Sequence, residues 1–259
     1  MHVDYLSKVF GLAGRTALVT GSSGGLGLAI AEALGHAGAR IVVNGRDPRR
    51  CADAAAKLSG ARIDAIASSF DVTDGDSVAN AESNLREQGV LVDVLIANAG
   101  VQNRKPLVNT SLSEWRELLD THVDGAFNCV RAFLPRMLER GFGRIVLMSS
   151  IAGQAAMPNI SAYATAKGAL GAFTRAIAVE YGGRGITANA VAPGFVRTPL
   201  TRGLQDSPEF QKFLSSAVPA GRWAEPSDIA PAVVFLAAAA GAFVNGHVLT
   251  IDGGLLARM

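Results

Sequence analysis

Short apolar runs alternate with longer amphipathic stretches along almost the whole chain, and this rhythm constrains the fold more than any other feature. The runs of strand length are rich in Val, Ile, Leu and Ala: Thr16–Thr20, Arg40–Asn44, Ile63–Ser68, Val92–Ala97, Arg144–Met148, Ile186–Val191 and His247–Ile251. Near-continuous apolar strands separated by helices are typical of a parallel sheet that is buried on both faces. We therefore predict an α/β fold, doubly wound and Rossmann-type, with about seven parallel strands and helices on both faces.

The intervening stretches predict the helices of this fold. They are Leu26–Ala37, Arg49–Leu58, Asp74–Gln88, Leu112–Arg140, Ala162–Tyr181 and Pro226–Ala239. No Pro/Ser-rich linker, composition break or short repeat interrupts the order, so residues 1–259 are predicted to form a single domain. Ligands of such a sheet bind beyond the carboxyl ends of the strands.

The composition argues against several classes of function. The 259 residues are 49% hydrophobic, and a net charge of +2 is too small to indicate a nucleic-acid partner. Cys51 and Cys129 have no paired spacing, so neither a disulfide scaffold nor a metal site is expected. No apolar run is long enough to span a bilayer, and residues 1–8 do not resemble a signal peptide. A cytoplasmic protein with no membrane partner is predicted.

A glycine-rich turn follows the first predicted strand and leads directly into a helix. It reads Thr20-Gly21-Ser22-Ser23-Gly24-Gly25-Leu26-Gly27. Glycine permits a sharp turn and a close approach of the backbone to a ligand, and a helix N-terminus favours a pyrophosphate. The glycine spacing is wider than in the common dinucleotide fingerprint, and a purely structural turn is the alternative. The position between strand and helix favours a dinucleotide site.

The residues after the second predicted strand indicate whether the protein prefers NAD or NADP. NAD-dependent proteins usually have an acidic residue there, and its carboxylate would repel a 2′-phosphate. This chain has Asn44-Gly45-Arg46 instead, and a guanidinium can hold a phosphate through charge-assisted hydrogen bonds. We predict that NADP(H) is preferred over NAD(H). The alternative is that Arg46 is only a solvated surface residue.

From Leu12 to Gly254 the chain resembles the short-chain dehydrogenases/reductases, through short motifs in a specific order. They are Thr20–Gly27, Asp71-Val72, Asn98-Ala99-Gly100, Ser150, Tyr163-Ala164-Thr165-Ala166-Lys167, Pro193-Gly194 and Ile251-Asp252-Gly253-Gly254. The resemblance implies an oxidoreductase that transfers a hydride between NADP(H) and a carbonyl or secondary alcohol. It also implies a cofactor site made of Gly21, Ser23, Gly25, Leu26, Gly27, Asp71, Val72, Asn98, Ala99, Gly100, Tyr163, Lys167, Pro193, Gly194, Val196 and Thr198.

Ser150, Tyr163 and Lys167 are the predicted catalytic residues. Tyr163 and Lys167 are four residues apart, so their side chains share one face of a helix. A nearby ammonium and a positive nicotinamide ring would lower the pKa of the phenol from about 10 and so ease proton transfer. Ser150, just after the fifth strand, would hold the substrate oxygen beside Tyr163.

His122 departs from the family pattern, which has an asparagine at this place in the long helix. The family asparagine helps to hold a water that passes protons from the lysine to solvent. A histidine can donate and accept, so we predict either that His122 serves the same catalytic relay or that it only packs within the helix.

Three variable loops, 101–110, 151–161 and 195–222, are predicted to surround the substrate. Their polar residues are Gln102, Asn103, Arg104, Lys105, Gln154, Asn159, Arg197 and Arg202. A polar and partly cationic pocket favours hydroxylated or anionic substrates, although such loop residues are often only solvated. We expect Arg104 to pair with the carboxylate of a sugar acid.

Within the family, the chain resembles gluconate 5-dehydrogenases in the stretches Val43–Asp47, Pro219–Trp223 and Phe243–His247. This similarity implies a sugar acid or polyol as substrate. The long apolar-faced helices and the C-terminal strand resemble the family's tetramer interfaces and imply a homotetramer, or at least a dimer. One alternative is a 3-oxoacyl-thioester reductase that docks an acyl carrier protein on Arg131, Arg136 and Arg140. The other is a catalytically silent regulator that binds NADP(H).

Overall fold

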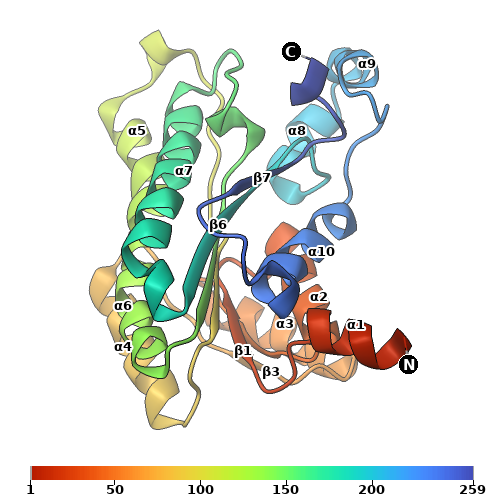
Figure 1. The fold of residues 1–259 in the computed structure, drawn as a ribbon. Helices are drawn as coiled ribbons and strands as arrows, with labels where there is room; N and C mark the ends of the chain where they lie inside the picture. The colour runs from red at the N-terminus through yellow and green to blue at the C-terminus, as the bar shows by residue number, and fades with distance from the viewer. Residues whose placement is uncertain (1, 259) are drawn as a thin grey trace.

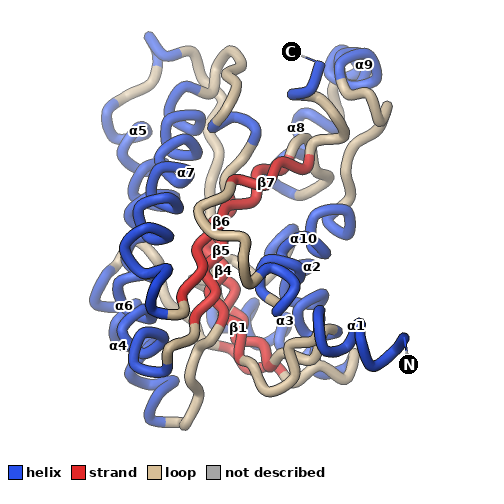
Figure 2. The backbone as a smooth tube through the Cα atoms, viewed as in Figure 1, coloured by secondary structure: helices blue, strands red, loops and turns tan. Residues whose placement is uncertain are grey.

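All strands of the protein belong to one parallel sheet, as the computed structural model shows (Figures 1 and 2). The structure describes residues 2–258, with side chains from Tyr5 onward. The strands are β1 (Thr16–Val19), β2 (Arg40–Val43), β3 (Ala65–Ala67), β4 (Val94–Ala97), β5 (Gly143–Met148), β6 (Ile186–Pro193) and β7 (Val248–Ile251). Their order is β3-β2-β1-β4-β5-β6-β7 and every neighbouring pair is parallel. The predicted doubly wound fold with seven strands is confirmed.

Helices cover both faces of the sheet (Figure 1). They are α1 (His2–Phe10), α2 (Gly25–His36), α3 (Pro48–Gly60), α4 (Gly75–Glu87), α5 (Leu112–Leu119), α6 (Gly125–Arg140), α7 (Ser161–Tyr181), α8 (Arg202–Gln205), α9 (Pro208–Ala217) and α10 (Pro226–Ala237). Apolar residues of α2, α3 and α10 pack on one face, and those of α4, α6 and α7 pack on the other. The strands are apolar nearly throughout because both of their faces are buried.

The strand order reverses at β1, which pairs with β2 on one side and with β4 on the other. The turns that follow β1 and β4 are joined by hydrogen bonds. The Oγ1 of Thr20 accepts from the backbone N–H of Asn98 and of Ala99 at 2.9 and 3.0 Å, and Asn98 Nδ2 donates to the Thr20 carbonyl at 2.9 Å. This reversal point at the carboxyl edge is where an open parallel sheet binds its ligand.

The prediction of one continuous helix over 112–140 is wrong. A π-helical turn, η2 (Asp120–Asp124), separates α5 from α6, and it turns His122 into the interior, where the side chain is 3% exposed. A single wider turn barely changes the spacing of the flanking apolar residues, so the sequence pattern still reads as one helix.

The segment 195–222, predicted to be a loop, contains α8 and α9. These helices are held by a small aromatic cluster, in which the Phe195 ring lies 5.0 Å from that of Phe210 and 5.9 Å from that of Trp223. Leu214 on α9 is buried in the same cluster. The two short helices depend on these contacts, which the local sequence pattern does not reveal.

Candidate active site

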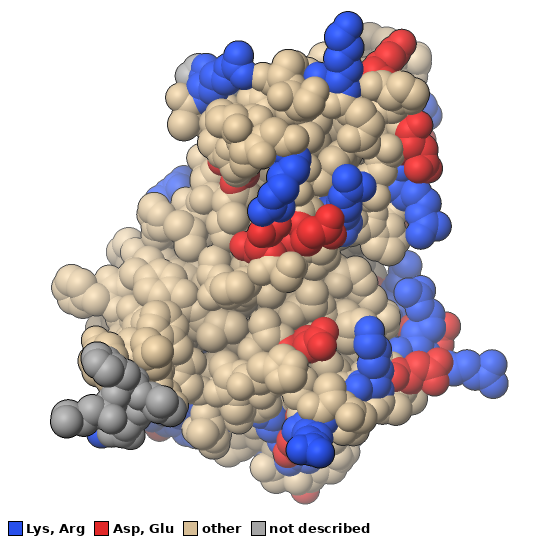
Figure 3. Space-filling model, turned by 90° about the vertical axis from the view of Figure 1, so that its right-hand side faces the viewer, with Lys and Arg blue, Asp and Glu red and all other residues tan. Residues whose placement is uncertain are grey.

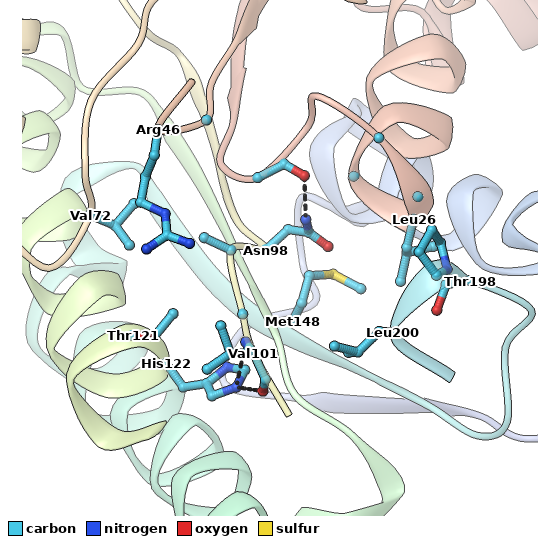
Figure 4. Close-up of a pocket in the computed structure, with 18 of the residues that line it drawn as sticks. Leu26, Arg46, Val72, Asn98, Val101, Thr121, His122, Met148, Thr198 and Leu200 are labelled. Carbon is cyan, nitrogen blue, oxygen red and sulfur yellow. Dashed lines mark hydrogen bonds between the residues drawn. The ribbon is translucent and has the colours of Figure 1, made fainter. Parts of the chain in front are cut away.

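A cleft of about 1110 Å³ opens at the carboxyl edge of the sheet (Figure 4). Its walls include all of the predicted cofactor and catalytic residues, which come from the ends of six strands and from η2 and α7: Gly21, Ser23, Gly25, Leu26, Gly27, Arg46, Asp71, Val72, Asn98, Ala99, Gly100, His122, Ser150, Tyr163, Lys167, Pro193, Gly194, Val196 and Thr198. The topology thus brings together residues that are up to 177 positions apart in the chain. The structure places them in one site.

The glycine turn has the shape that a pyrophosphate site requires. A Cβ atom on Gly21 would lie 2.9 Å from the Ala99 Cα, and one on Gly27 would lie 2.5 Å from Asn98 Nδ2. The turn can therefore be this tight only with glycine at these positions. No side chain caps the first turn of α2, so its N–H groups and the positive end of its dipole are available to an anion. The turn fits a dinucleotide.

The end of β5 is fixed to α7 beside the catalytic residues. Ser149 Oγ donates to the Lys167 carbonyl at 2.8 Å. A Cβ atom on Gly153 would lie 2.7 Å from the same carbonyl group, so the turn after Ser150 packs directly on the backbone of α7. Ser150 Oγ accepts from the backbone N–H of Ala152 at 3.1 Å, and the Ser150 and Tyr163 side chains line the same cleft. The Ser150 hydroxyl is a hydrogen-bonding neighbour that acts to lower the pKa of the Tyr163 phenol, as expected for two groups that face one substrate oxygen.

The pKa of Tyr163 differs from the sequence-based expectation. Burial raises this pKa above the ordinary value, while the Ser150 hydrogen bond and the charge of Arg104 act in the lowering direction. We had expected Lys167 to lower it. Instead, Lys167 Nζ donates to the Met148 carbonyl at 2.6 Å, and burial lowers the pKa of Lys167 itself to about 7. The loss of hydration on burial outweighs the nearby charges.

His122 lies between the backbone after β4 and the catalytic tyrosine. Its Nε2 is 2.7 Å from the Val101 carbonyl oxygen (Figure 4). The His122 ring is edge-on to that of Tyr163, with 5.4 Å between centroids. The Val101 backbone nitrogen lies 3.3 Å from the same Nε2, and the shorter contact to the carbonyl favours the tautomer in which Nε2–H donates to Val101. Burial is the main cause that lowers the pKa of His122 to about 3, so the ring is neutral at physiological pH. Its Nδ1 is buried with no hydrogen-bond partner among the described residues.

Comparisons with known proteins agree with this geometry. The family model described as enoyl-(acyl carrier protein) reductase matches residues 21–256. The chain belongs to the short-chain dehydrogenase/reductase family. A gluconate 5-dehydrogenase of Gluconobacter oxydans (strain 621H) is 38% identical over 247 residues, which cover 95% of this chain and 96% of the relative. A 5-keto-D-gluconate 5-reductase of Escherichia coli (strain K12) is 34% identical, with coverage of 97% and 99%.

A solved structure extends the comparison to the fold. The crystal structure of a gluconate 5-dehydrogenase from Burkholderia cenocepacia J2315 in complex with NADP and tartrate has a TM-score of 0.96 to this chain. It is 37% identical, and the match covers 98% of this chain and 99% of that one. The similarity in fold thus extends over nearly all of both chains, including the glycine turn and the cleft at the carboxyl edge of the sheet.

The predicted substrate loops of this family member contribute less to the cleft than expected. Of the first two loops, only Val101 lies among the cleft residues. Lys105 is neutralised by Glu114, with Nζ 2.9 Å from Oε1, and Arg197 is paired with Glu225 at 3.0 Å. Arg104 is not among the cleft residues, but it forms no ion pair among the described residues and its charge acts on Tyr163.

Sequence reasoning missed several residues that line the cleft. They include Arg50, Arg116 and Met148, whereas Gly24, Pro199 and Leu200 fall within the turn and the loop that the sequence already predicts to border the site. Arg50 lies in the first turn of α3, four residues after Arg46, and that spacing was the available signal. Met148 carries no motif, because contact through an apolar side chain leaves no distinctive mark in the sequence.

Proposed function

We propose that the protein is an NADP(H)-dependent oxidoreductase that interconverts a secondary alcohol and a carbonyl of a sugar acid. The observation that carries this proposal is that Ser150, Tyr163 and Lys167 line the same cleft as the glycine turn. The same cleft offers both an anion site and a proton donor.

The residues divide the chemistry between them. NADPH held in this cleft would supply the hydride that the carbonyl carbon receives on reduction. Ser150 holds the carbonyl oxygen by a hydrogen bond, and Tyr163 gives that oxygen its proton. Lys167 lies with its Nζ 5.5 Å from the centroid of the Tyr163 ring and donates to the Met148 carbonyl at the end of β5, so it links the helix of Tyr163 to the strand that precedes Ser150. In the direction of oxidation, the phenolate takes the proton from the alcohol.

The choice of NADP(H) rests on Arg46, which lines the cleft and extends toward Val72 (Figure 4). Arg46 forms no ion pair with an acidic residue among those described. The structural neighbour from Burkholderia cenocepacia, crystallised with NADP, supports the same choice. Proteins that select NAD usually have an acidic residue at the end of the second strand, and this chain has Asn44-Gly45-Arg46 there.

A sugar-acid substrate is supported by Arg104 and by the relatives that act on gluconate or 5-ketogluconate. We expect Arg104→Ala to raise the KM for 5-ketogluconate about tenfold or more, because a charged hydrogen bond to the carboxylate is lost. Lys105→Ala is the matched control, since this cation is already paired with Glu114. An unchanged KM in Arg104→Ala would show that Arg104 does not bind the substrate carboxylate.

A thioester substrate fits the surface less well. Arg136 is paired with Glu139 at 2.7 Å and Arg140 with Asp93 at 3.3 Å, so of the three arginines on α6 only Arg131 has no acidic partner among the described residues. The opposite side of the molecule also mixes positive and negative side chains (Figure 3). An acyl carrier protein is acidic and would need an unneutralised basic surface. Reduction rates with 5-ketogluconate and with an acetoacetyl thioester, measured by NADPH absorbance, distinguish a sugar-acid reductase from a thioester reductase. A catalytically silent regulator would reduce neither compound.

We further propose a homotetramer. Support comes from exposed apolar side chains on α6 and α7, where Phe127 is 48% and Val179 is 87% exposed. Large exposed apolar residues that cluster are typical of subunit interfaces. Within residues 2–258 no helix is long and apolar enough to cross a membrane. The cytoplasmic location stays a prediction.

A further inference from the structure

We propose that Arg50 is a second specificity residue, which together with Arg46 clamps the 2′-phosphate of NADP(H). This inference rests on the proposed use of NADP(H). The two arginines line the same cleft and both come from the segment that follows β2. The end of this strand is where the ribose 2′-oxygen lies in a doubly wound fold.

The first turn of α3 is packed tightly against the glycine turn, and this contact places Arg50. A Cβ atom on Gly45 would lie 3.1 Å from both Cys51 Sγ and Ser23 Oγ, so the two turns meet with no room for a side chain. The Cys51 side chain is fully buried at this junction. The backbone adds to the contact, since Ser22 N–H donates to the Asn44 carbonyl at 2.8 Å. This packing therefore fixes the backbone of Arg50, which precedes Cys51 in the chain.

The guanidinium of Arg50 lies over Gly24, the residue that precedes α2. A Cβ atom on Gly24 would be 3.7 Å from Arg50 Nη2, and it would meet no other heavy atom within 4 Å. Because position 24 has no side chain, the Arg50 guanidinium occupies the space beside the glycine turn. Arg46 extends toward Val72 instead (Figure 4). The two cations thus extend toward different walls of the cleft, Arg50 toward Gly24 and Arg46 toward Val72.

The charge of Arg50 is available to a ligand. Asp47, the nearest acidic residue in the chain, caps α3 by accepting the backbone N–H of Arg49 and Arg50 at 2.9 and 3.2 Å. Among the described residues the Arg50 side chain forms no hydrogen bond or ion pair. An unpaired guanidinium beside a phosphate site favours an anion with which it can form charge-assisted hydrogen bonds.

The 2′-phosphate is the more suitable partner than the pyrophosphate. The pyrophosphate already has the free N–H groups and the dipole of α2. The 2′-phosphate carries close to two negative charges at neutral pH, and a single arginine neutralises only part of them. A second guanidinium therefore acts on the charge that distinguishes NADP from NAD.

The test compares Arg50→Ala with Arg49→Ala by calorimetric titration of the full-length protein. Arg49 is the neighbouring arginine of the same helical turn and lies outside the cleft. We expect Arg50→Ala to weaken binding of NADPH and of 2′,5′-ADP about tenfold, with ADP and NADH binding unchanged. Arg49→Ala should leave all four affinities within about twofold.

A second variant tests the position of the charge. Gly24→Arg in the Arg50→Ala background should restore the NADPH affinity, since its side chain starts in the space that Arg50 occupies and Gly24 has an extended backbone. Equal losses of NADPH and NADH binding in Arg50→Ala would assign Arg50 to the pyrophosphate and overturn the proposal. Losses no larger than in Arg49→Ala would also overturn it. Failure of the wild-type protein to bind NADPH would instead contradict the proposed function.

Discussion

Lys167 carries an ammonium group although the residue is almost completely buried, with 5% of its surface exposed. Its hydrogen bond to the Met148 carbonyl offsets only part of the lost hydration, so the pKa of Lys167 falls to about 7. The unfolded chain holds this proton up to a pH of about 10.4. Between these values the unfolded state binds more protons at this position than the folded state does.

The stability of the protein should therefore rise with pH through this window. By linkage, the free energy of unfolding of the wild type relative to Lys167→Met should increase by about 2 kcal/mol between pH 7 and pH 9. Below pH 7 the difference should be nearly constant, because lysine is then protonated in both states. Urea titrations of both proteins at several pH values measure it. A difference that is independent of pH would contradict the lowered pKa.

His122 should act through its contact with Val101 and not by passing a proton. The Nε2–H group donates to a backbone carbonyl, which cannot accept a proton for transfer to solvent. We expect His122→Gln, which keeps a donor near this position, to retain kcat within about threefold and the wild-type pH profile. His122→Leu should lower the free energy of unfolding by about 1–3 kcal/mol, since the Val101 carbonyl loses its partner. A large loss of kcat in the stable Gln variant would favour the relay.

The sequence was sufficient to identify site residues whose chemistry only one or two residue types can provide. Tyr163, Lys167 and the glycines of the turn are of this kind, and the structure brings them into one cleft. Protonation was not predictable, because the pKa of Tyr163 depends on how many atoms surround it. The position of Arg50 depends on the packing of two turns that are distant in the sequence.

At the scale of elements, the contact between the turn after β5 and α7 positions Ser150. A Cβ atom on Gly153 would come within 2.7 Å of backbone atoms of Lys167, and backbone cannot yield as a side chain does. Gly153→Ala should lower the free energy of unfolding by about 1–3 kcal/mol and reduce kcat through displacement of Ser150.

The matched control for this variant is Gly60→Ala in α3, where an added Cβ atom meets nothing within 4 Å. This substitution should raise the free energy of unfolding by about 0.5–1 kcal/mol, as expected for alanine in a helix. Thermal denaturation and initial rates of the two variants provide the comparison. Equal stability of both variants would mean that the turn does not press on α7.

Elements were predictable where one pattern extends over several turns. All seven strands and the six main helical stretches were found from apolar periodicity, with the long stretch mistaken for one helix. The π-turn η2 escaped notice because it leaves the apolar spacing on either side intact. Helices α8 and α9 form on the aromatic cluster of Phe195, Phe210 and Trp223, and such tertiary support is not visible in a local pattern.

At the scale of the whole molecule, the proposed tetramer predicts a mass near four times the 26.8 kDa of the chain. Phe127 on α6 and Phe173 on α7 have ring centroids 6.4 Å apart, and Phe127 is half exposed, so these rings are candidates for the interface. Phe127→Glu should produce a smaller species in sedimentation, because a buried carboxylate would be unpaired there. A wild-type protein that sediments as a monomer would contradict the tetramer.

The central claim is that the phenol of Tyr163, which lines the cleft together with Ser150, transfers the proton during reduction. The measurement that tests it most directly is the kcat of Tyr163→Phe with NADPH and 5-ketogluconate, alongside the NADPH affinity of the same variant. We predict a loss of about 10²–10⁴ in kcat with an affinity within about threefold of wild type, because only the hydroxyl is removed. Turnover close to the wild-type rate in a variant that binds NADPH normally would contradict the account.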